Sequence, residues 1–154
     1  MLEEVYSLLK EIKVHDDSYL VSCFFMNKEW GVDFYLPKEH KICTYFRKDG
    51  KLQSITDEIF QKKQKRLEKL DLSKVKISYL EALDRVTVDT DKAIVILQEV
   101  KGVLVWNITI LTSEFKIYNL KVNAKNGKTI SEEEENIMNF KKGGPEIKMT
   151  KDAS

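Results

Sequence analysis

Cysteine is scarce in this chain, with Cys23 and Cys43 as the only two among 154 residues. A fold held together by several disulfides is therefore excluded. Both cysteines lie in apolar runs typical of β-strands, where a reduced thiol packs as a small hydrophobic side chain. We expect both thiols to be free and buried, because a disulfide needs an oxidising compartment that nothing else in the sequence indicates.

Long apolar runs are also missing. No stretch approaches the roughly 18 apolar residues that a transmembrane helix needs. The first four residues, Met-Leu-Glu-Glu, lack the basic start of a secretory signal peptide. These absences predict a globular protein in the cytoplasm, and the 42% of apolar residues are enough to build a core.

Neither sign of charge dominates, since 26 basic residues stand against 25 acidic ones. No overall field therefore draws the chain towards nucleic acid or an anionic membrane. Charged residues nevertheless make up 33% of the sequence. That proportion hints at an archaeal or thermophilic source, because proteins from hot environments are rich in lysine and glutamate.

Motifs of known catalytic and metal sites are absent. The sequence has no GxSxG, HExxH or CxxC motif and no glycine-rich phosphate loop. The two histidines, His15 and His40, stand in connections between predicted elements, without a second ligand at a recognised spacing. We expect a protein that is not an enzyme and that holds neither a cofactor nor a metal.

What the chain does contain is regular hydrophobic periodicity. Helical spacing over residues 2–12 predicts an amphipathic helix, and a second stripe over 56–70 predicts a helix that links the two halves. Two Ser-x-x-Glu capping boxes, Ser78 with Glu81 and Ser131 with Glu134, predict further helix starts. Period-two alternation and turn pairs such as Asp49-Gly50 predict strands over residues 19–26, 29–36, 41–47, 51–53, 93–100, 103–111 and 116–123.

The two halves match each other at an offset of 74 to 77 residues. Trp30, Val32 and Phe34 correspond to Trp106, Ile108 and Ile110, and Gly50-Lys51 corresponds to Gly127-Lys128. We therefore predict an α+β fold made of two tandem helix-plus-antiparallel-sheet repeats of the α-β-β-β-α type. The first repeat spans residues 1–72 with the linking helix, the second spans 73–140, and 141–154 form a flexible tail.

The segment from Ser78 to Glu135 resembles a PepSY domain. The resemblance lies in a capped helix containing Leu80-Glu81-Ala82-Leu83, a tryptophan-containing strand, and a closing segment in which Asn123, Ala124, Gly127 and Ile130 occupy the family's positions. It implies a regulatory or inhibitory module without a catalytic motif of its own. PepSY units are often extracytoplasmic and linked to peptidases. A looser likeness exists to tandem helix-plus-sheet inhibitors such as beta-lactamase inhibitor protein.

A sheet covered by helices on one face leaves its other face for a partner. The alternation places the tryptophans on the covered face and Asp33, Tyr35, Asn107 and Thr109 on the opposite one. Tyr35 is the expected anchor, because an exposed aromatic ring with a polar tip binds at low entropic cost. We predict a non-enzymatic binding, regulatory or inhibitory module that meets a protein partner through this face. The alternatives are that the two repeats pack these faces on each other, or that two copies of the chain pair through an unprotected sheet edge.

A basic cluster supports a different interpretation. Lys62, Lys63, Lys65, Arg66 and Lys69 fall in the expected linking helix, where they would contact the phosphates of a nucleic acid. A helix face that is merely solvated explains the same residues, because Glu58 stands four residues before Lys62 and supports an ion pair along the helix. The alternative function is thus that of a nucleic-acid-associated protein.

Overall fold

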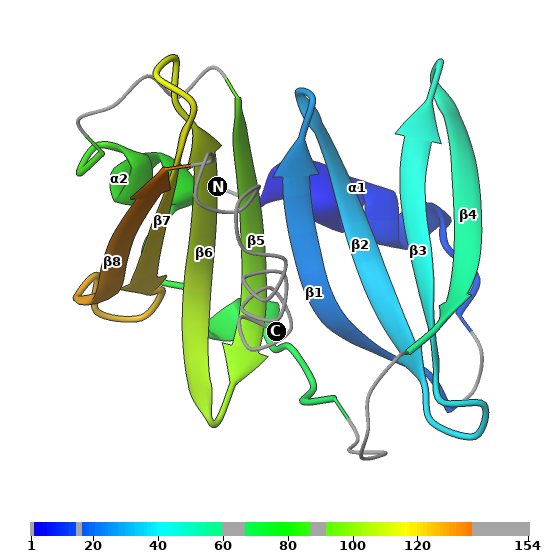
Figure 1. Ribbon diagram of the computed structural model, residues 1–154. Coiled ribbons are helices and arrows are strands. Elements are labelled where there is room, and N and C mark those ends of the chain that lie inside the picture. Colours follow the sequence, from blue (N-terminus) through cyan, green and yellow to red (C-terminus); the bar gives the residue numbers. More distant parts are fainter. Residues whose placement is uncertain (1, 15–16, 60–66, 87–91, 137–154) are drawn as a thin grey trace.

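The computed structural model describes residues 2–14, 17–59, 67–86 and 92–136. Within these ranges, eight antiparallel strands form one continuous sheet in the order β4-β3-β2-β1-β5-β6-β7-β8. The helices α1 (Glu3–Glu11) and α2 (Tyr79–Leu83) both lie on one face of this sheet (Figure 1). The strands are β1 (Tyr19–Met26), β2 (Glu29–Leu36), β3 (Lys41–Lys48), β4 (Lys51–Glu58), β5 (Ala93–Val100), β6 (Val103–Leu111), β7 (Lys116–Asn123) and β8 (Thr129–Asn136).

Two-residue turns join β1 to β2, β3 to β4 and β5 to β6 and set their register. Asn27-Lys28, Asp49-Gly50 and Lys101-Gly102 each have positive φ at both residues, as type I′ hairpin turns require. All three turns stand where the sequence predicts them. Ser78 also caps α2 as expected, because its side chain accepts a hydrogen bond from the backbone N–H of Glu81 at 3.2 Å.

The expected α+β fold of two tandem helix-plus-sheet repeats is wrong. The chain is mainly β. Within the described ranges its two α-helices span nine and five residues, and β1 pairs directly with β5, which places the eight described strands in one sheet. The pattern of side chains does not predict which strands pair, because the hydrogen bonds between strands are made by backbone groups that every residue carries. The expected tail, residues 141–154, lies outside the described ranges.

The expected helix that begins at Ser131 is wrong, and the expected linking helix is wrong at both of its ends. Thr56–Glu58 of the expected linking helix continue β4, residues 60–66 lie outside the described ranges, and residues 67–70 are not helical. The segment expected to begin a helix at Ser131 is strand β8. Its serine and glutamate have the spacing of a capping box, but pairing with β7 satisfies the backbone groups that a cap would serve.

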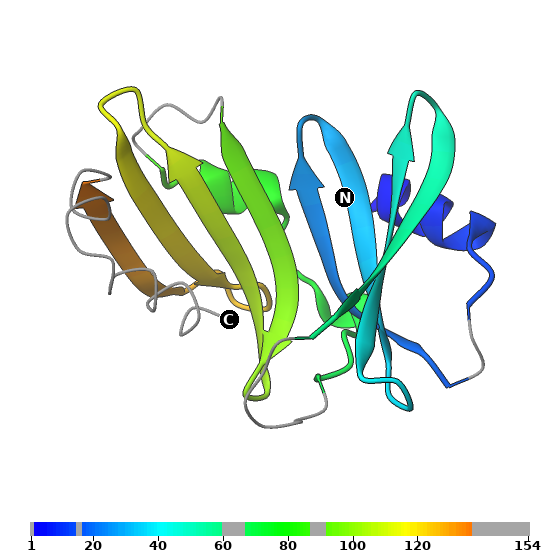
Figure 2. The same ribbon diagram turned by 45° about the vertical axis from the view of Figure 1, so that its right-hand side comes forward.

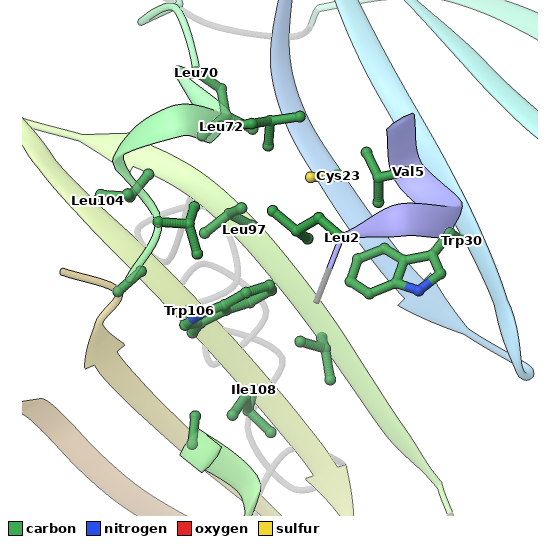
Figure 3. Close-up of a cluster of buried hydrophobic side chains, with 14 of the residues drawn as sticks. Leu2, Val5, Cys23, Trp30, Leu70, Leu72, Leu97, Leu104, Trp106 and Ile108 are labelled. Carbon is green, nitrogen blue, oxygen red and sulfur yellow. The ribbon is translucent and has the colours of Figure 1, made fainter. Parts of the chain in front are cut away.

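The core lies between the sheet and the two helices and runs across both halves of the chain. Trp30 on β2 and Trp106 on β6 are buried as predicted, and their ring centres lie 6.5 Å apart. The Trp106 indole N–H donates to the carbonyl of Ile77 at 2.7 Å. Figure 3 shows Leu2 beside the two rings, with Val5 of α1, Cys23 of β1 and Leu97 of β5 packed around them. Cys23 and Cys43 are buried free thiols, which confirms the prediction.

The two groups of four strands meet at what we call the seam, the pairing of β1 with β5. It comprises four register pairs, from Ser22 with Gln98 to Phe25 with Val95. At one end of the seam the Leu70 N–H donates to the Leu20 carbonyl at 2.8 Å. The two strands diverge beyond the other end (Figures 1 and 2), where a pocket of about 840 Å³ lies between them.

Candidate functional site

The face of the sheet opposite the helices is the candidate site, and we call it the open face. Strand register fixes which side chains reach it, because directly paired residues of antiparallel strands point to the same side. Phe24 on β1 pairs with Gly31 on β2 and with Ile96 on β5. These positions therefore form one row across the middle of the open face.

A groove of about 540 Å³ crosses this row. Its walls are mostly apolar and come from both sides of the seam. The lining residues are Val21, Ser22, Phe24, Met26, Asp33, Ile42, Ile59, Leu67, Glu68, Ile94, Ile96, Gln98 and Glu99. Met26 and Ile94 keep 40% and 39% of their surface exposed, so apolar surface remains in contact with water at the centre of the sheet.

Gly31 allows the Phe24 ring to form the floor of the groove. A Cβ atom at Gly31 would lie 2.1 Å from the ring carbon Cζ of Phe24, which is far inside van der Waals contact. The ring therefore lies flat against the backbone of β2 and covers the glycine. This arrangement, in which an aromatic residue covers a glycine on the neighbouring strand, stabilises a position where glycine would otherwise weaken the sheet.

Asp33, a predicted site residue, borders the groove. Its two carboxylate oxygens accept hydrogen bonds from the hydroxyls of Ser22, at 2.6 Å, and Thr44, at 2.5 Å. The three residues are neighbours on β1, β2 and β3, because Asp33 pairs with both Ser22 and Thr44. The carboxylate is thus held in place as a fixed polar point beside apolar walls.

The predicted role of Tyr35 as an exposed anchor is wrong. Its side chain does lie on the open side of β2, but it is only 1% exposed. The ring packs edge-on against Tyr19 with centres 5.6 Å apart, and the hydroxyl lies 2.7 Å from Nδ1 of His40. Alternation correctly assigned the face, but neighbouring aromatic side chains cover this end of it.

Asn107 and Thr109 also lie on the open face, on β6 beyond the seam, and neither lines the groove. The Asn119 amide on β7 donates to Asn107 Oδ1 at 2.7 Å and to Thr109 Oγ1 at 3.0 Å. The structure therefore brings these two predicted residues together in one polar cluster. That cluster is separate from Asp33, which lies on the other side of the seam.

Four residues of the basic cluster, Lys62, Lys63, Lys65 and Arg66, lie outside the described ranges. The fifth, Lys69, is exposed in the segment that leads to the 3-10 turn η1 (Leu72–Lys74). Within the part of the chain that the structure describes, no group of three or more His, Cys, Asp or Glu residues could hold a metal ion. No helix among the same residues is long and apolar enough to cross a membrane.

The apolar residues of the groove were not among the predicted site residues. A signal for them exists in the sequence, because Cys23-Phe24-Phe25 on β1 and Ile94-Val95-Ile96 on β5 are apolar at consecutive positions. A strand with one face in water normally alternates, whereas a strand covered on both faces is apolar throughout. Both strands thus have the composition of covered strands, although no described element covers their open side.

The groove also has a definite electrostatic character. Three of its described lining residues, Asp33, Glu68 and Glu99, carry carboxylates, and no lysine or arginine lines it within the ranges that the structure describes. The Glu68 carboxylate accepts hydrogen bonds from the backbone N–H groups of Lys101, at 2.6 Å, and Gly102, at 3.0 Å. Among the described residues, the groove therefore combines an apolar floor with carboxylates from Asp33 and Glu68 at its border.

Among solved structures, the fold is similar to that of a putative lipoprotein from Clostridium difficile 630, with a TM-score of 0.61. The two chains are 16% identical over 85% of this chain and 90% of that one. At this identity the likeness shows a shared fold alone. No protein-family model and no curated protein matches the chain, so the resemblance to PepSY domains stays a prediction.

Proposed function

We propose that this protein is a binding module that holds a segment of a partner protein in the groove on its open face. The observation that carries the proposal is the apolar floor built from Phe24, Ile94 and Ile96 at the seam. Contiguous exposed apolar surface with a polar rim is typical of protein interaction sites. Burying it would gain roughly 25 cal/mol for each Å² removed from water.

The chemistry of the rim narrows the kind of partner. An occupant needs apolar side chains for the floor and a lysine or arginine to face the carboxylate of Asp33. An acidic segment is disfavoured by like charge, and so is the phosphate backbone of a nucleic acid. The basic residues 62–66 of the alternative nucleic-acid role lie outside the described ranges, so that role stays a prediction.

Peptide selection with the full chain provides a direct test. A random peptide library displayed on phage is panned against the protein, and the selected peptides are then measured by fluorescence anisotropy. We expect sequences that combine apolar residues with lysine or arginine. Selection of acidic or purely polar sequences, or of none, would contradict the proposal.

Two matched variants locate the binding surface. Ile94→Glu adds a charge at the apolar floor, whereas Val103→Glu adds the same charge on β6 outside the groove, at a position of similar exposure. We expect the first variant to weaken binding at least about tenfold and the second to leave it within about twofold, because unpaired charges are costly only where the contact excludes water. If both variants weaken peptide binding equally, the binding site is not the groove.

The remaining expectations stay predictions. The absence of enzymatic activity and the cytoplasmic location were inferred from sequence, and a fold likeness at 16% identity carries no function to this chain. Fractionation of cells that express the natural gene, with an antibody to the protein, measures its location directly. Recovery in a membrane or extracytoplasmic fraction would contradict the predicted location and leave the groove proposal intact.

A further inference from the structure

We propose that β4 is a dimerisation edge, at which a second copy of this chain pairs antiparallel with the first and extends the sheet. This inference is independent of the groove. β4 pairs with β3 along all eight of its residues, and it ends the sheet on that side. The outer row of its backbone donors and acceptors is therefore a template for another strand.

Two of the usual protections of an edge strand, proline and a β-bulge, are absent from β4. It has no proline, and its register with β3 runs from Lys41–Glu58 to Lys48–Lys51 without a bulge. Every residue except Leu52 is exposed, including Ile55, whose side chain is 50% exposed. A long, regular edge with an exposed apolar residue favours pairing with another strand.

The opposite edge of the sheet has a different character. β8 carries four consecutive glutamates, Glu132 to Glu135, so a second β8 placed beside it would bring like charges together. β4 carries only Lys51 near one end and Asp57 and Glu58 at the other. The sheet is therefore protected at one edge and open to extension at the other, which favours a closed dimer over a filament.

Opposite charges along β4 determine the register in which the two copies pair. A two-fold axis through Ser54 places Lys51 of each copy opposite Asp57 of the other, so that two ion pairs form per dimer. Both residues lie on the open face, because Asp57 pairs with Ile42, which in turn pairs with Tyr35, and Lys51 is an even number of residues from Asp57. Opposite charges directly across an antiparallel pair stabilise it, and like charges destabilise it.

The same register buries exposed apolar surface. It places Ile55 of each copy opposite Gln53 of the other, so the aliphatic part of the glutamine covers the isoleucine. A single strand pair buries less than the roughly 1,200 Å² of a standard interface, so the dimer forms in a concentration-dependent way. The open faces of the two copies then become one continuous surface.

Sedimentation velocity on the full chain tests the proposal. We expect a monomer of 18.0 kDa at low concentration and a species of twice that mass as the concentration rises from about 10 µM to about 1 mM. A protein that stays monomeric across this range would overturn the inference. It would leave the groove proposal untouched, because that proposal requires only one copy.

Charge reversal identifies the edge and the register together. Lys51→Asp and Asp57→Lys each place like charges opposite one another twice per dimer, so we expect the dissociation constant to rise at least about fivefold. Combining the two changes in one chain restores opposite charges, and the dissociation constant should return to within about twofold of the original.

The control is Lys121→Asp, which makes the same change on β7, far from β4 on the open face. It should leave the dimer unchanged, and circular dichroism should show that every variant is folded. If the single reversals leave dimerisation unchanged, or if the double variant fails to restore it, the β4 pairing is refuted.

Discussion

At the scale of single residues, burial raises the pKa of one thiol and two tyrosine hydroxyls. Burial, with a smaller contribution from Asp33, raises the pKa of the Cys23 thiol to about 12. Burial also raises the pKa of Tyr45 to about 12, assisted by Cys43, and that of Tyr118 to about 12, assisted by its hydrogen bond to Glu132. All three groups are thus held in their neutral, protonated form by the fold.

These shifts predict a loss of stability at alkaline pH. Unfolding lets each group return to its ordinary pKa, 9.0 for the thiol and 10.0 for the tyrosines, so above pH 9 the unfolded chain loses protons that the folded chain keeps. The free energy of unfolding should therefore be level up to about pH 9 and fall between pH 9 and pH 12. Urea unfolding at pH 7, 9, 10 and 11 measures the slope. In the Tyr118→Phe variant the fall above pH 10 should be shallower, and an unchanged slope would contradict the assignment.

Tyr35 allows a second test at this scale. Tyr35→Phe keeps the buried ring but removes the hydroxyl that pairs with Nδ1 of His40. The other ring nitrogen, Nε2, is already buried without a hydrogen-bond partner among the described residues. The variant would therefore remove the hydrogen bond between the imidazole and the Tyr35 side chain. We expect the free energy of unfolding to fall by about 1 kcal/mol. Tyr6→Phe on the exposed face of α1 is the matched control and should change it by less than about 0.5 kcal/mol.

At the scale of elements, Gly31 determines the shape of the groove. Gly31→Ala pushes the Phe24 ring out of its position against β2, so we expect a loss of about 1–3 kcal/mol in unfolding free energy. In a Phe24→Ala background the new methyl group has room, and the same change should cost less than about 0.5 kcal/mol. Chemical denaturation of the original protein, the two single variants and the double variant measures the four free energies of unfolding. Equal costs in both backgrounds would show that the ring does not cover the glycine.

The elements differ in how far sequence predicts them. Strands flanked by type I′ turns, such as β2 and β3, follow from alternation and turn chemistry. The edge strands β4 and β8 do not, because they have little core-facing apolar surface and their residues favour other structures in isolation. Glutamates 132–135 illustrate the difficulty, since a run of glutamate favours the first turn of a helix. In the structure, Glu132 instead accepts a hydrogen bond from Tyr118 on the neighbouring strand.

The candidate site was predictable only in part, for a related reason. Alternation identifies the face on which Asp33, Asn107 and Thr109 lie, because the side-chain period of a strand is two. It does not identify the groove, which exists because β1 and β5 become neighbours across 70 residues of sequence. Nor does it identify covering contacts such as that of Tyr19 on Tyr35, which bury a residue on the nominally open side.

At the scale of the whole molecule, the seam makes the two halves one cooperative unit. Trp30 and Trp106 touch across it, and Glu68 ties the segment before η1 to the β5–β6 turn. Glu68→Ala should therefore lower the stability of the entire chain by about 1 kcal/mol within a single transition. Urea unfolding followed by tryptophan fluorescence and by circular dichroism measures this. Glu133→Ala on exposed β8 is the control, and two separate transitions would contradict the prediction.

The seam is held at both ends by contacts outside its register pairs. At one end the hydroxyl of Tyr19 donates to the Leu67 carbonyl at 2.7 Å, and the Leu70 N–H donates to the Leu20 carbonyl. At the other end the Tyr79 ring on α2 packs against Phe25 and Trp30, with ring centres 5.4 Å apart in both pairs. Because Phe24 pairs with Ile96 inside the seam, the floor of the groove belongs to both halves at once, and the groove exists only while the two halves stay joined.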